Sequence, residues 1–231
     1  MSSAASVLHR IASTVEMRPL VCDHVVRGRV VFPGAAYLEM ARAMQCMTAP
    51  SPSPVRLALL LFLQPLVLDE CACVECTLDG GSGELTVRSR ASRGTADSAI
   101  HFSAVAASDA HSRQPAPSWL RSRVSHPTRG SSLYDMFWSV GLEYGPAHRT
   151  LDVAWASAGA AIGRLRGRRE WQGTQLHPAD LDGALQLPMA IAEASAGRAP
   201  PTLLPFAADA ATVAVGRCRL WPVRVRCLGV R

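Results

Sequence analysis

Hydrophobic and polar residues alternate along several short segments of this chain, and a period of two is typical of half-buried strands. Residues 67–78 show the pattern most clearly, because two faces separate along them. The hydrophobic face carries Leu68, Ala72, Val74, Cys76 and Leu78, and the other face carries Asp69, Cys71, Cys73, Glu75 and Thr77. A glycine turn follows at 80–83, and further strands are predicted over Glu84–Arg90, Ile100–Ala107, Leu151–Ala156, Ala160–Arg166 and Leu220–Cys227.

Two other segments place hydrophobic residues three or four positions apart, which marks the buried face of a helix. The first helix begins after Pro33 and Gly34, and its face carries Tyr37, Met40, Ala41, Met44 and Met47. The second runs from Pro178 to about Ala194, and its face carries Leu181, Leu185, Met189 and Ala192. Pro188 removes a backbone hydrogen bond inside the second helix, so we expect a kink or an early end there. A shorter helix is predicted over Leu133–Val140.

Each half of the chain therefore combines strands with one hydrophobic helix, and a polar stretch rich in Pro and Ser separates the halves. A curled sheet wrapped around one helix is a hotdog arrangement. We predict an α+β fold, a double hotdog, in which each half is a curled antiparallel sheet wrapped around a central helix. The expected boundaries are 1–114 for the N-terminal hotdog, 115–132 for the linker and 133–231 for the C-terminal hotdog.

The composition fits such a fold and limits the classes of partner that the protein can bind. Of the 231 residues, 48% are hydrophobic and 18% are charged, which provides a sizeable core and excludes a disordered chain. No hydrophobic run reaches the roughly 18 residues that a membrane span needs. The net charge is +6, and all 24 basic residues are arginines because lysine is absent. The densest basic patch lacks any nucleic-acid motif and suits either an acidic partner or a solvated surface. It consists of Arg164, Arg166, Arg168 and Arg169.

Seven cysteines and the lack of a secretory signal indicate reduced thiols, so we expect a cytoplasmic protein. Cys71, Cys73 and Cys76 resemble a zinc-binding cluster at first sight. The strand alternation places Cys76 on the opposite face from the other two, and no second pair or nearby histidine completes a tetrahedral site. We therefore expect no metal and no bound cofactor.

A histidine stands on a constrained loop just before the first hydrophobic helix. His24 is followed by Gly28, which permits a tight turn, and by Pro33 with Gly34, which start the helix. A histidine in such a place is most often structural. Because the return path of this loop is fixed, it is also a reasonable position for a general base.

A carboxylate stands in the corresponding place on the second helix. Asp182 and Gln186 are four residues apart and share one helix face, so the glutamine amide can orient the carboxyl group. An Asp near a helix N-terminus is commonly a partner of the helix dipole. Here Leu181 and Leu185 flank it on a buried helix, and desolvation there would raise its pKa and suit a general acid. A third segment, Tyr144-Gly145-Pro146, is a turn preceded by a phenol.

Taken in order, the three segments resemble the dehydratase domains of polyketide synthases, which are similar to those of fatty acid synthases. From the first motif to the last, the resemblance spans most of the chain. The family pattern HxxxGxxxxP is matched by His24, Gly28 and Pro33. The pattern YGPxF is matched by Tyr144, Gly145 and Pro146, and HPAxxDxxxQ by His177, Pro178, Ala179, Asp182 and Gln186. Leu204, Pro205 and Phe206 form a weaker fourth match.

The resemblance implies a double hotdog and assigns roles to these residues. His24 would remove the C2 proton of a 3-hydroxyacyl thioester, and Asp182 would protonate the departing hydroxyl group. Gln186 would orient Asp182, and Tyr144 would help to place the substrate. Gly28, Pro33, Gly145 and Pro146 would shape the loops. The resemblance also implies a substrate carried on the phosphopantetheine arm of an acyl carrier protein, other polyketide synthase domains as partners, and leaves a homodimer open.

Three residues depart from the family pattern. His148 stands where the family has an aromatic residue, Asp180 where it has an aliphatic one, and Pro188 interrupts the second helix. Family members continue beyond the position of Arg231, so we also expect a C-terminal hotdog that is truncated. The alternatives to a dehydratase are aldol cyclisation of a poly-ketone chain, as in product template domains, and a non-catalytic double-hotdog segment.

Overall fold

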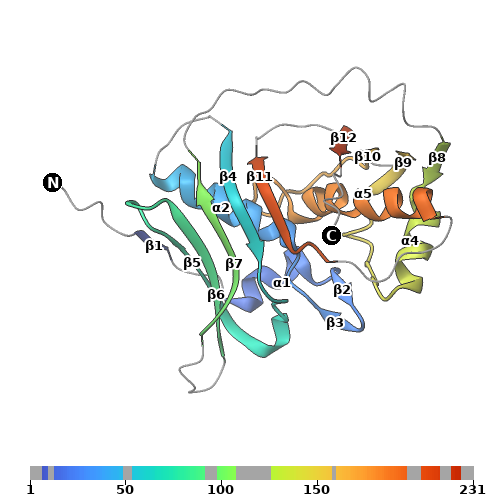
Figure 1. The fold of residues 1–231 in the computed structure, drawn as a ribbon. Helices are drawn as coiled ribbons and strands as arrows, with labels where there is room; N and C mark the ends of the chain where they lie inside the picture. The colour runs from blue at the N-terminus through green and yellow to red at the C-terminus, as the bar shows by residue number, and fades with distance from the viewer. Residues whose placement is uncertain are drawn as a thin grey trace.

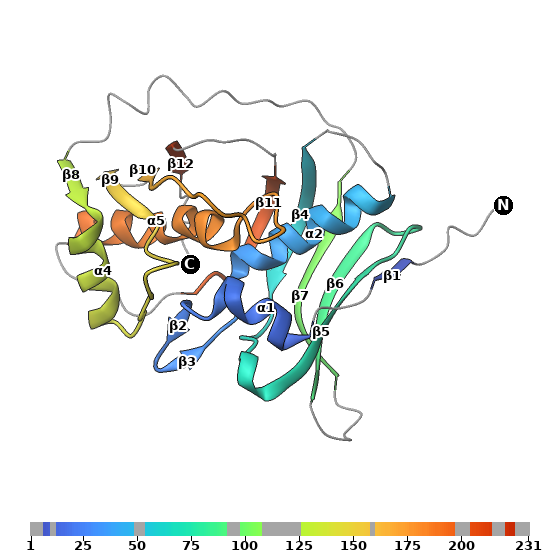
Figure 2. The same ribbon diagram turned by 180° about the vertical axis from the view of Figure 1, so that it is seen from behind.

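The computed structural model describes residues 7–9, 13–48, 54–91, 98–107, 126–157, 160–196, 204–213 and 220–224. Within them, two separate antiparallel sheets each pack against one long helix (Figure 1, Figure 2). This arrangement confirms the predicted α+β double hotdog.

The larger sheet has six strands in the order β1-β5-β6-β7-β4-β11. These strands are β1 (Val7–His9), β4 (Val55–Phe62), β5 (Cys71–Leu78), β6 (Glu84–Ala91), β7 (Ser98–Ala106) and β11 (Ala207–Val213). Helix α2 (Gly34–Thr48) packs against β4, β5 and β11. Its buried face joins Tyr37, Ala41 and Met44 to a core that includes Leu57 and Phe102. Met47, the last residue of the predicted face, is exposed.

The smaller sheet has four strands in the order β12-β10-β9-β8. These strands are β8 (His126–Arg129), β9 (Leu151–Ser157), β10 (Ala160–Leu165) and β12 (Leu220–Arg224). Helix α5 (Pro178–Ala196) packs on β9, β10 and β12, and the shorter α4 (Gly130–Ser139) packs on β8 and β9. Leu151, Ala161 and Leu187 belong to the second core.

The two hotdogs meet along their helices, because α2 contacts α5 directly. Helix α1 (Thr14–Val21) also contacts α5 and begins with a capping box, in which Ser13 and Glu16 bond each other's backbone N–H groups. A hairpin of β2 (Val25–Val26) and β3 (Arg29–Val30) follows α1. The single turn η1 (Leu68–Glu70) leads into β5.

Strand β11 corrects the predicted domain boundaries. It comes from the C-terminal half of the sequence but pairs with β4 of the N-terminal sheet, from Ala207↔Leu61 to Val213↔Val55. The predicted boundary of 133–231 therefore does not coincide with one sheet. The predicted linker 115–132 is also too long, because its last residues form β8 and the start of α4. Alternation identifies a strand but not the sheet edge that it will join.

Three local predictions also change. Helix α5 continues through Pro188 to Ala196 and does not end early. The pairing register of β5 shifts between Cys71 and Cys73, so Cys71 is buried although strict alternation placed it on the polar face. Strands β4 and β11 were not predicted at all. The end of the last predicted strand, beyond Arg224, lies outside the described residues.

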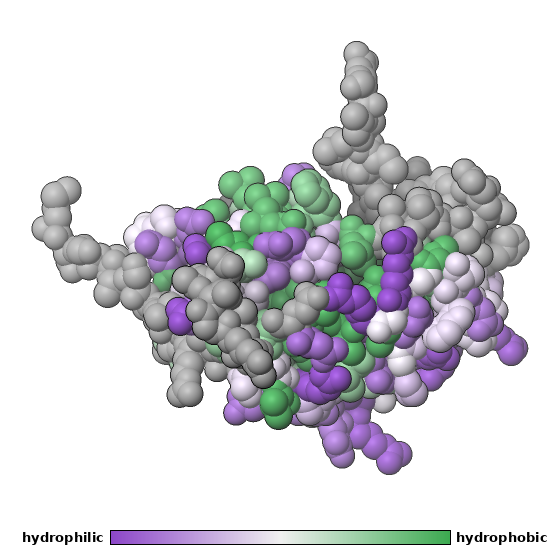
Figure 3. Space-filling view, turned by 90° about the horizontal axis from the view of Figure 1, so that it is seen from below, coloured by the Kyte–Doolittle hydropathy of each residue, from purple (hydrophilic) through white to green (hydrophobic). Residues whose placement is uncertain are grey.

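The surface carries a notable share of hydrophobic residues. Figure 3 shows hydrophobic side chains gathered across the middle of one face, with hydrophilic ones around them. The large side chains of Leu59, Leu63, Leu204 and Phe206 are exposed. Of the helices in the described ranges, none is long and apolar enough to cross a membrane.

Candidate active site

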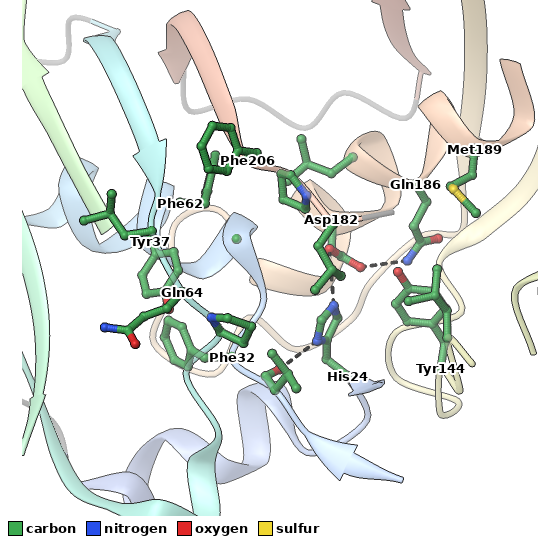
Figure 4. A pocket seen from close by; sticks show the side chains of 18 residues that line it. His24, Phe32, Tyr37, Phe62, Gln64, Tyr144, Asp182, Gln186, Met189 and Phe206 are labelled. Atoms are coloured by element: carbon green, nitrogen blue, oxygen red, sulfur yellow. Dashed lines mark hydrogen bonds and ion pairs between the residues drawn. The ribbon is translucent and has the colours of Figure 1, made fainter. Parts of the chain in front are cut away.

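A pocket of about 270 Å³ lies between the two hotdogs, and side chains from both halves line it (Figure 4). Phe32, Tyr37 and Phe62 form an apolar region at one side of it. The opposite side holds the polar residues of the predicted site, which are His24, Tyr144, Asp182 and Gln186. Sequence motifs that lie far apart in the chain therefore meet in one cavity.

His24 is a buried imidazole whose tautomer is fixed by its own loop. Its Nδ1 lies 2.7 Å from the carbonyl oxygen of Val31, and a carbonyl can only accept, so Nδ1 carries the proton. The backbone N–H of Val31 donates back to the oxygen of His24 at 3.0 Å. The turn between them uses Arg27 and Gly28 at φ values of 49° and 74°, which suit a tight hairpin. In the neutral ring, Nε2 is therefore the free base.

Asp182 lies in the second turn of α5 and is buried opposite that base. Its Oδ1 is 3.8 Å from Nε2 of His24, and both side chains are less than 10% exposed (6% and 7%). Burial raises the pKa of Asp182 because the ionised carboxylate loses its hydration, while His24 and a hydrogen bond from Gln186 oppose that rise. The carboxyl group is therefore suited to hold a proton.

Gln186 connects Asp182 to a buried tyrosine. Its Nε2 donates to Oδ2 of Asp182 at 2.8 Å, and its Oε1 accepts from the hydroxyl of Tyr134 at 3.0 Å. The Tyr134 oxygen accepts in turn from the backbone N–H of Leu151 at 3.0 Å. Because Oδ2 already accepts a hydrogen bond, a proton on Asp182 resides on Oδ1. The network therefore directs the acidic proton toward His24 and the pocket.

The turn at Tyr144 packs against the loop that carries His24. The two rings meet edge to face at 5.5 Å, and burial raises the pKa of the Tyr144 phenol well above its usual range, so it remains a donor. Asp23 ties the two loops together. Its backbone oxygen accepts from Gly145 N–H at 2.8 Å and its carboxylate accepts from Ala147 N–H at 2.6 Å. A Cβ at position 145 would overlap the carboxylate of Asp23, so glycine allows the two loops to approach this closely.

Among the other predicted residues, Leu204, Pro205 and Phe206 line the pocket, whereas Gly28, Pro33 and Pro146 do not. Gly28 lies at the exposed tip of the hairpin, and Pro146 lines a separate surface hollow. Pro33 is buried just before α2, whose first residue, Gly34, does line the pocket. A Cβ on Gly34 would lie 3.0 Å from the ring of Phe62, so the helix start closely approaches the pocket wall.

The residues that depart from the family pattern occupy defined places. Asp180 forms an ion pair with Arg168 at 2.9 Å and does not act on Asp182. His148 is completely buried, with its ring 5.6 Å from the ring of His24.

His177, within the predicted motif, caps α5, because its Nδ1 accepts from the backbone N–H of Ala179 at 3.2 Å. Burial lowers the pKa of His177 to about 4.

Sequence reasoning missed two residues of the site. Tyr134 was assigned only to a short helix, yet its hydroxyl holds Gln186. Asp23, the residue before His24, carried no sequence signal of its own, yet it joins the two loops. The only sequence feature near Asp23 is its position directly before His24, far upstream of the Gly145-Pro146 turn. No sequence pattern pointed to Tyr134.

No group of three or more His, Cys, Asp or Glu side chains suited to a metal ion occurs within the described residues. Cys71, Cys73 and Cys76 form no disulfide within the described part of the chain. Burial raises the pKa of Cys76 to about 12, so this sulfur is not a thiolate ligand.

Comparisons with known proteins agree with this geometry. The family model "Polyketide synthase dehydratase domain" matches residues 1–91, and "Polyketide synthase dehydratase N-terminal domain" matches residues 112–226. The chain is 32% identical to polyketide synthase ThaG of Burkholderia thailandensis over 73% of this chain and 3% of ThaG. It is 30% identical to polyketide synthase GfsE of Streptomyces halstedii over 84% of this chain and 5% of GfsE. The chain thus spans a small part of each relative.

Solved structures show the same fold. The dehydratase domain from the CurF module of curacin polyketide synthase superposes with a TM-score of 0.79 at 19% identity, covering 100% of this chain and 85% of that one. The dehydratase domain of a mycocerosic acid synthase-like polyketide synthase gives 0.72 at 25% identity, covering 90% and 79%. With both family models matched in order and the motif residues gathered in one pocket, the chain belongs to the polyketide synthase dehydratase domain family.

Proposed function

We propose that this chain removes water from a 3-hydroxyacyl thioester carried on an acyl carrier protein and releases an enoyl thioester. One observation carries the proposal. Nε2 of His24 and Oδ1 of Asp182 face each other from opposite halves of a largely apolar pocket. Their hydrogen bonds leave the first as a proton acceptor and the second as a proton donor.

In the first step, Nε2 of His24 takes a proton from C2 of the thioester. The thioester carbonyl makes this proton acidic, and Nδ1–H bonded to Val31 holds the ring in place as charge develops on it. Gly34, the first residue of α2, lines the pocket, so backbone N–H groups at this helix start lie near the proposed substrate. They are suited to stabilise the negative charge that develops on the carbonyl oxygen.

In the second step, the C3–O bond breaks and Oδ1–H of Asp182 protonates the hydroxyl group as it leaves. Hydroxide is a poor leaving group, so the acid is required. The products are an enoyl thioester and one water molecule. His24 then carries the proton from C2 and Asp182 is ionised. Proton return from His24 to Asp182, across the 3.8 Å gap or through the product water, restores both groups.

The test is incubation of the purified chain with a 3-hydroxyhexanoyl thioester, followed by mass spectrometry. Loss of one water and growth of the enoyl absorbance are the expected results. The same assay with a poly-ketone thioester distinguishes the aldol alternative. Ring formation there, without any dehydration of the hydroxyacyl substrate, would contradict the proposal, and so would inertness toward both substrates in a folded sample.

Arginines near the site support docking of an acidic carrier protein. A surface hollow of about 360 Å³ is lined by four of them, Arg149, Arg166, Arg168 and Arg169. Arg166 and Arg169 are exposed and form no ion pair within the described part of the chain, while Arg168 is held by Asp180. Arg164, the remaining member of the predicted patch, lies outside the hollow and pairs with Asp152 at 2.6 Å. We therefore propose Arg166 and Arg169 as the carrier contacts.

Salt dependence tests this docking. Raising ionic strength from 0.1 M to 1 M shortens the Debye length from about 10 Å to about 3 Å, which weakens exposed charge pairs. Turnover of carrier-bound substrate should fall steeply, while turnover of a small thioester should hardly change. Arg166→Ser with Arg169→Ser should raise KM for the carrier substrate alone, and Arg164→Ser is the matched control. Parallel salt curves for the two substrates would exclude a role for these arginines.

A further inference from the structure

His148 is a buried histidine that the proposed reaction does not use. It has no exposed surface, and its ring lies 5.6 Å from the ring of His24 with the two planes at 61°. It does not line the substrate pocket. Its backbone oxygen accepts from the hydroxyl of Tyr134 at 3.4 Å and from Nε2 of Gln186 at 3.5 Å. The residue thus contacts the base through its ring and the network of the acid through its backbone.

Packing alone does not account for an imidazole at this position. Neither ring nitrogen of His148 has a hydrogen-bond partner within the described part of the chain. A buried polar atom without a partner destabilises the folded state, and a phenyl ring would fill the same space without that cost. By contrast, His101, another buried histidine, bonds Ser89 at 2.7 Å and the Gln64 oxygen at 3.2 Å. The two ring nitrogens of His148 are therefore available to act electrostatically on the base beside them.

The surroundings keep the His148 ring uncharged. Burial lowers its pKa well below the usual range, and the nearby His24, His177 and Arg168 lower it further. The other titratable groups of this region act elsewhere. Asp182 is bonded by Gln186 and faces His24, Asp180 pairs with Arg168, and Tyr134 and Tyr144 stay protonated because burial raises the pKa of each phenol.

No hydrogen bond within the described residues fixes the tautomer of the neutral His148 ring. Either nitrogen of His148 can therefore present a lone pair, and the ring dipole can follow the charge on its neighbour. A phenyl ring offers no such response. When His24 takes the C2 proton, it becomes an imidazolium in a largely apolar pocket, where nearby dipoles act strongly.

We propose that His148 is a positioning residue that stabilises the imidazolium formed on His24 during proton abstraction. The inference rests on the proposed function for its catalytic meaning. The interaction between the two buried imidazoles can be measured whether or not the chain catalyses a reaction.

The test compares His148→Phe with the wild-type chain by NMR titration of imidazoles labelled at Cε1. We expect the titration midpoint of His24 to fall by about one pH unit in His148→Phe, which corresponds to about a tenfold weaker preference for the charged form. The thermal midpoint should rise by about 2–4 °C, because two unbonded buried nitrogens are removed. In the dehydration assay, the acidic limb of kcat/KM against pH should move in the same direction and kcat should fall.

Two further variants keep the result decisive. His148→Gln restores a donor and an acceptor and should retain most of the wild-type midpoint of His24, including when His148→Phe does not fold. His101→Phe, the matched control, should lower thermal stability and leave the His24 midpoint unchanged. An unchanged midpoint in His148→Phe overturns the inference, whether or not the chain is active. Lack of dehydration by the wild-type chain would instead overturn the proposed function and leave the NMR comparison valid.

Discussion

Oδ1 of Asp182 lies 3.8 Å from Nε2 of His24, and both side chains are buried although they come from opposite halves of the chain. Each is oriented by a bond on its far side, His24 by the Val31 carbonyl and Asp182 by the Gln186 amide. The two groups therefore present one vacant lone pair and one proton to the same cavity. Four predictions follow from this relationship and from the loops that hold it.

Replacement of the base should abolish dehydration without unfolding the chain. His24→Phe keeps an aromatic ring against Tyr144 and His148 but removes Nε2. General base catalysis contributes roughly 10²–10⁴-fold, so kcat/KM should fall by about that factor. The measurement is dehydration of a 3-hydroxyacyl thioester, with circular dichroism as the folding control. A folded His24→Phe with more than a tenth of wild-type turnover would show that another group is the base.

Loss of the acid and loss of its partner should differ in size. Asp182→Asn removes the proton donor and should lower kcat by roughly 10²–10⁴-fold. Gln186→Ala leaves the donor in place but frees its orientation, so we expect a loss of about 10- to 100-fold. Steady-state kinetics of both variants provide the comparison. Equal losses in the two variants would mean that Gln186 contacts the substrate itself.

The raised pKa of Asp182 predicts a pH dependence of stability. Its pKa is higher in the folded chain than the unfolded value of about 3.9. Its protonated form therefore favours folding at low pH, and that contribution is lost as pH rises through the folded pKa. Asp182→Asn lacks this loss, so its thermal midpoint should rise relative to that of the wild type as pH increases from 4 to 8.

Thermal melts of both chains across that range provide the measurement. Asp135→Asn, an exposed carboxylate on α4, is the matched control and should follow the wild type at each pH. A difference between Asp182→Asn and the wild type that stays constant from pH 4 to pH 8 would mean that Asp182 remains ionised in the folded chain.

Asp23 should be required for the arrangement of the two loops. Asp23→Ala leaves the exposed N–H of Ala147 without its 2.6 Å acceptor, which should cost about 0.5–1.5 kcal/mol of unfolding free energy because water can replace the carboxylate. Because Tyr144 and His24 are attached to these loops, kcat should fall as well. Asp23→Asn keeps an acceptor oxygen and should recover most of both losses. Urea denaturation measures the stability, and an Asp23→Ala chain with wild-type stability would contradict the bridging role.

Much of the fold was predictable because local periodicity carries it. The stripe of Tyr37, Ala41 and Met44 is a property of a single segment, and the structure buries it as expected. The hydrophobic face of Val74, Cys76 and Leu78 is buried as well, although Glu75 between them is also buried. The strand pairing of β11 with β4 was not predictable. It depends on which sheet edge lies open after both hotdogs have formed, and no periodicity within Ala207–Val213 specifies that edge.

By itself, the sequence determined the residues that meet in the pocket: spaced motifs around His24, Tyr144 and Asp182 each carry their own turn or helix start. Only the tertiary structure decided how those residues act. Motif spacing does not encode the 2.7 Å hydrogen bond between His24 and Val31 or the bond between Tyr134 and Gln186. It also does not encode the burial of His148. The physical reason is that periodicity specifies the face of a residue, whereas protonation depends on the desolvation and partners that distant segments supply when they pack together.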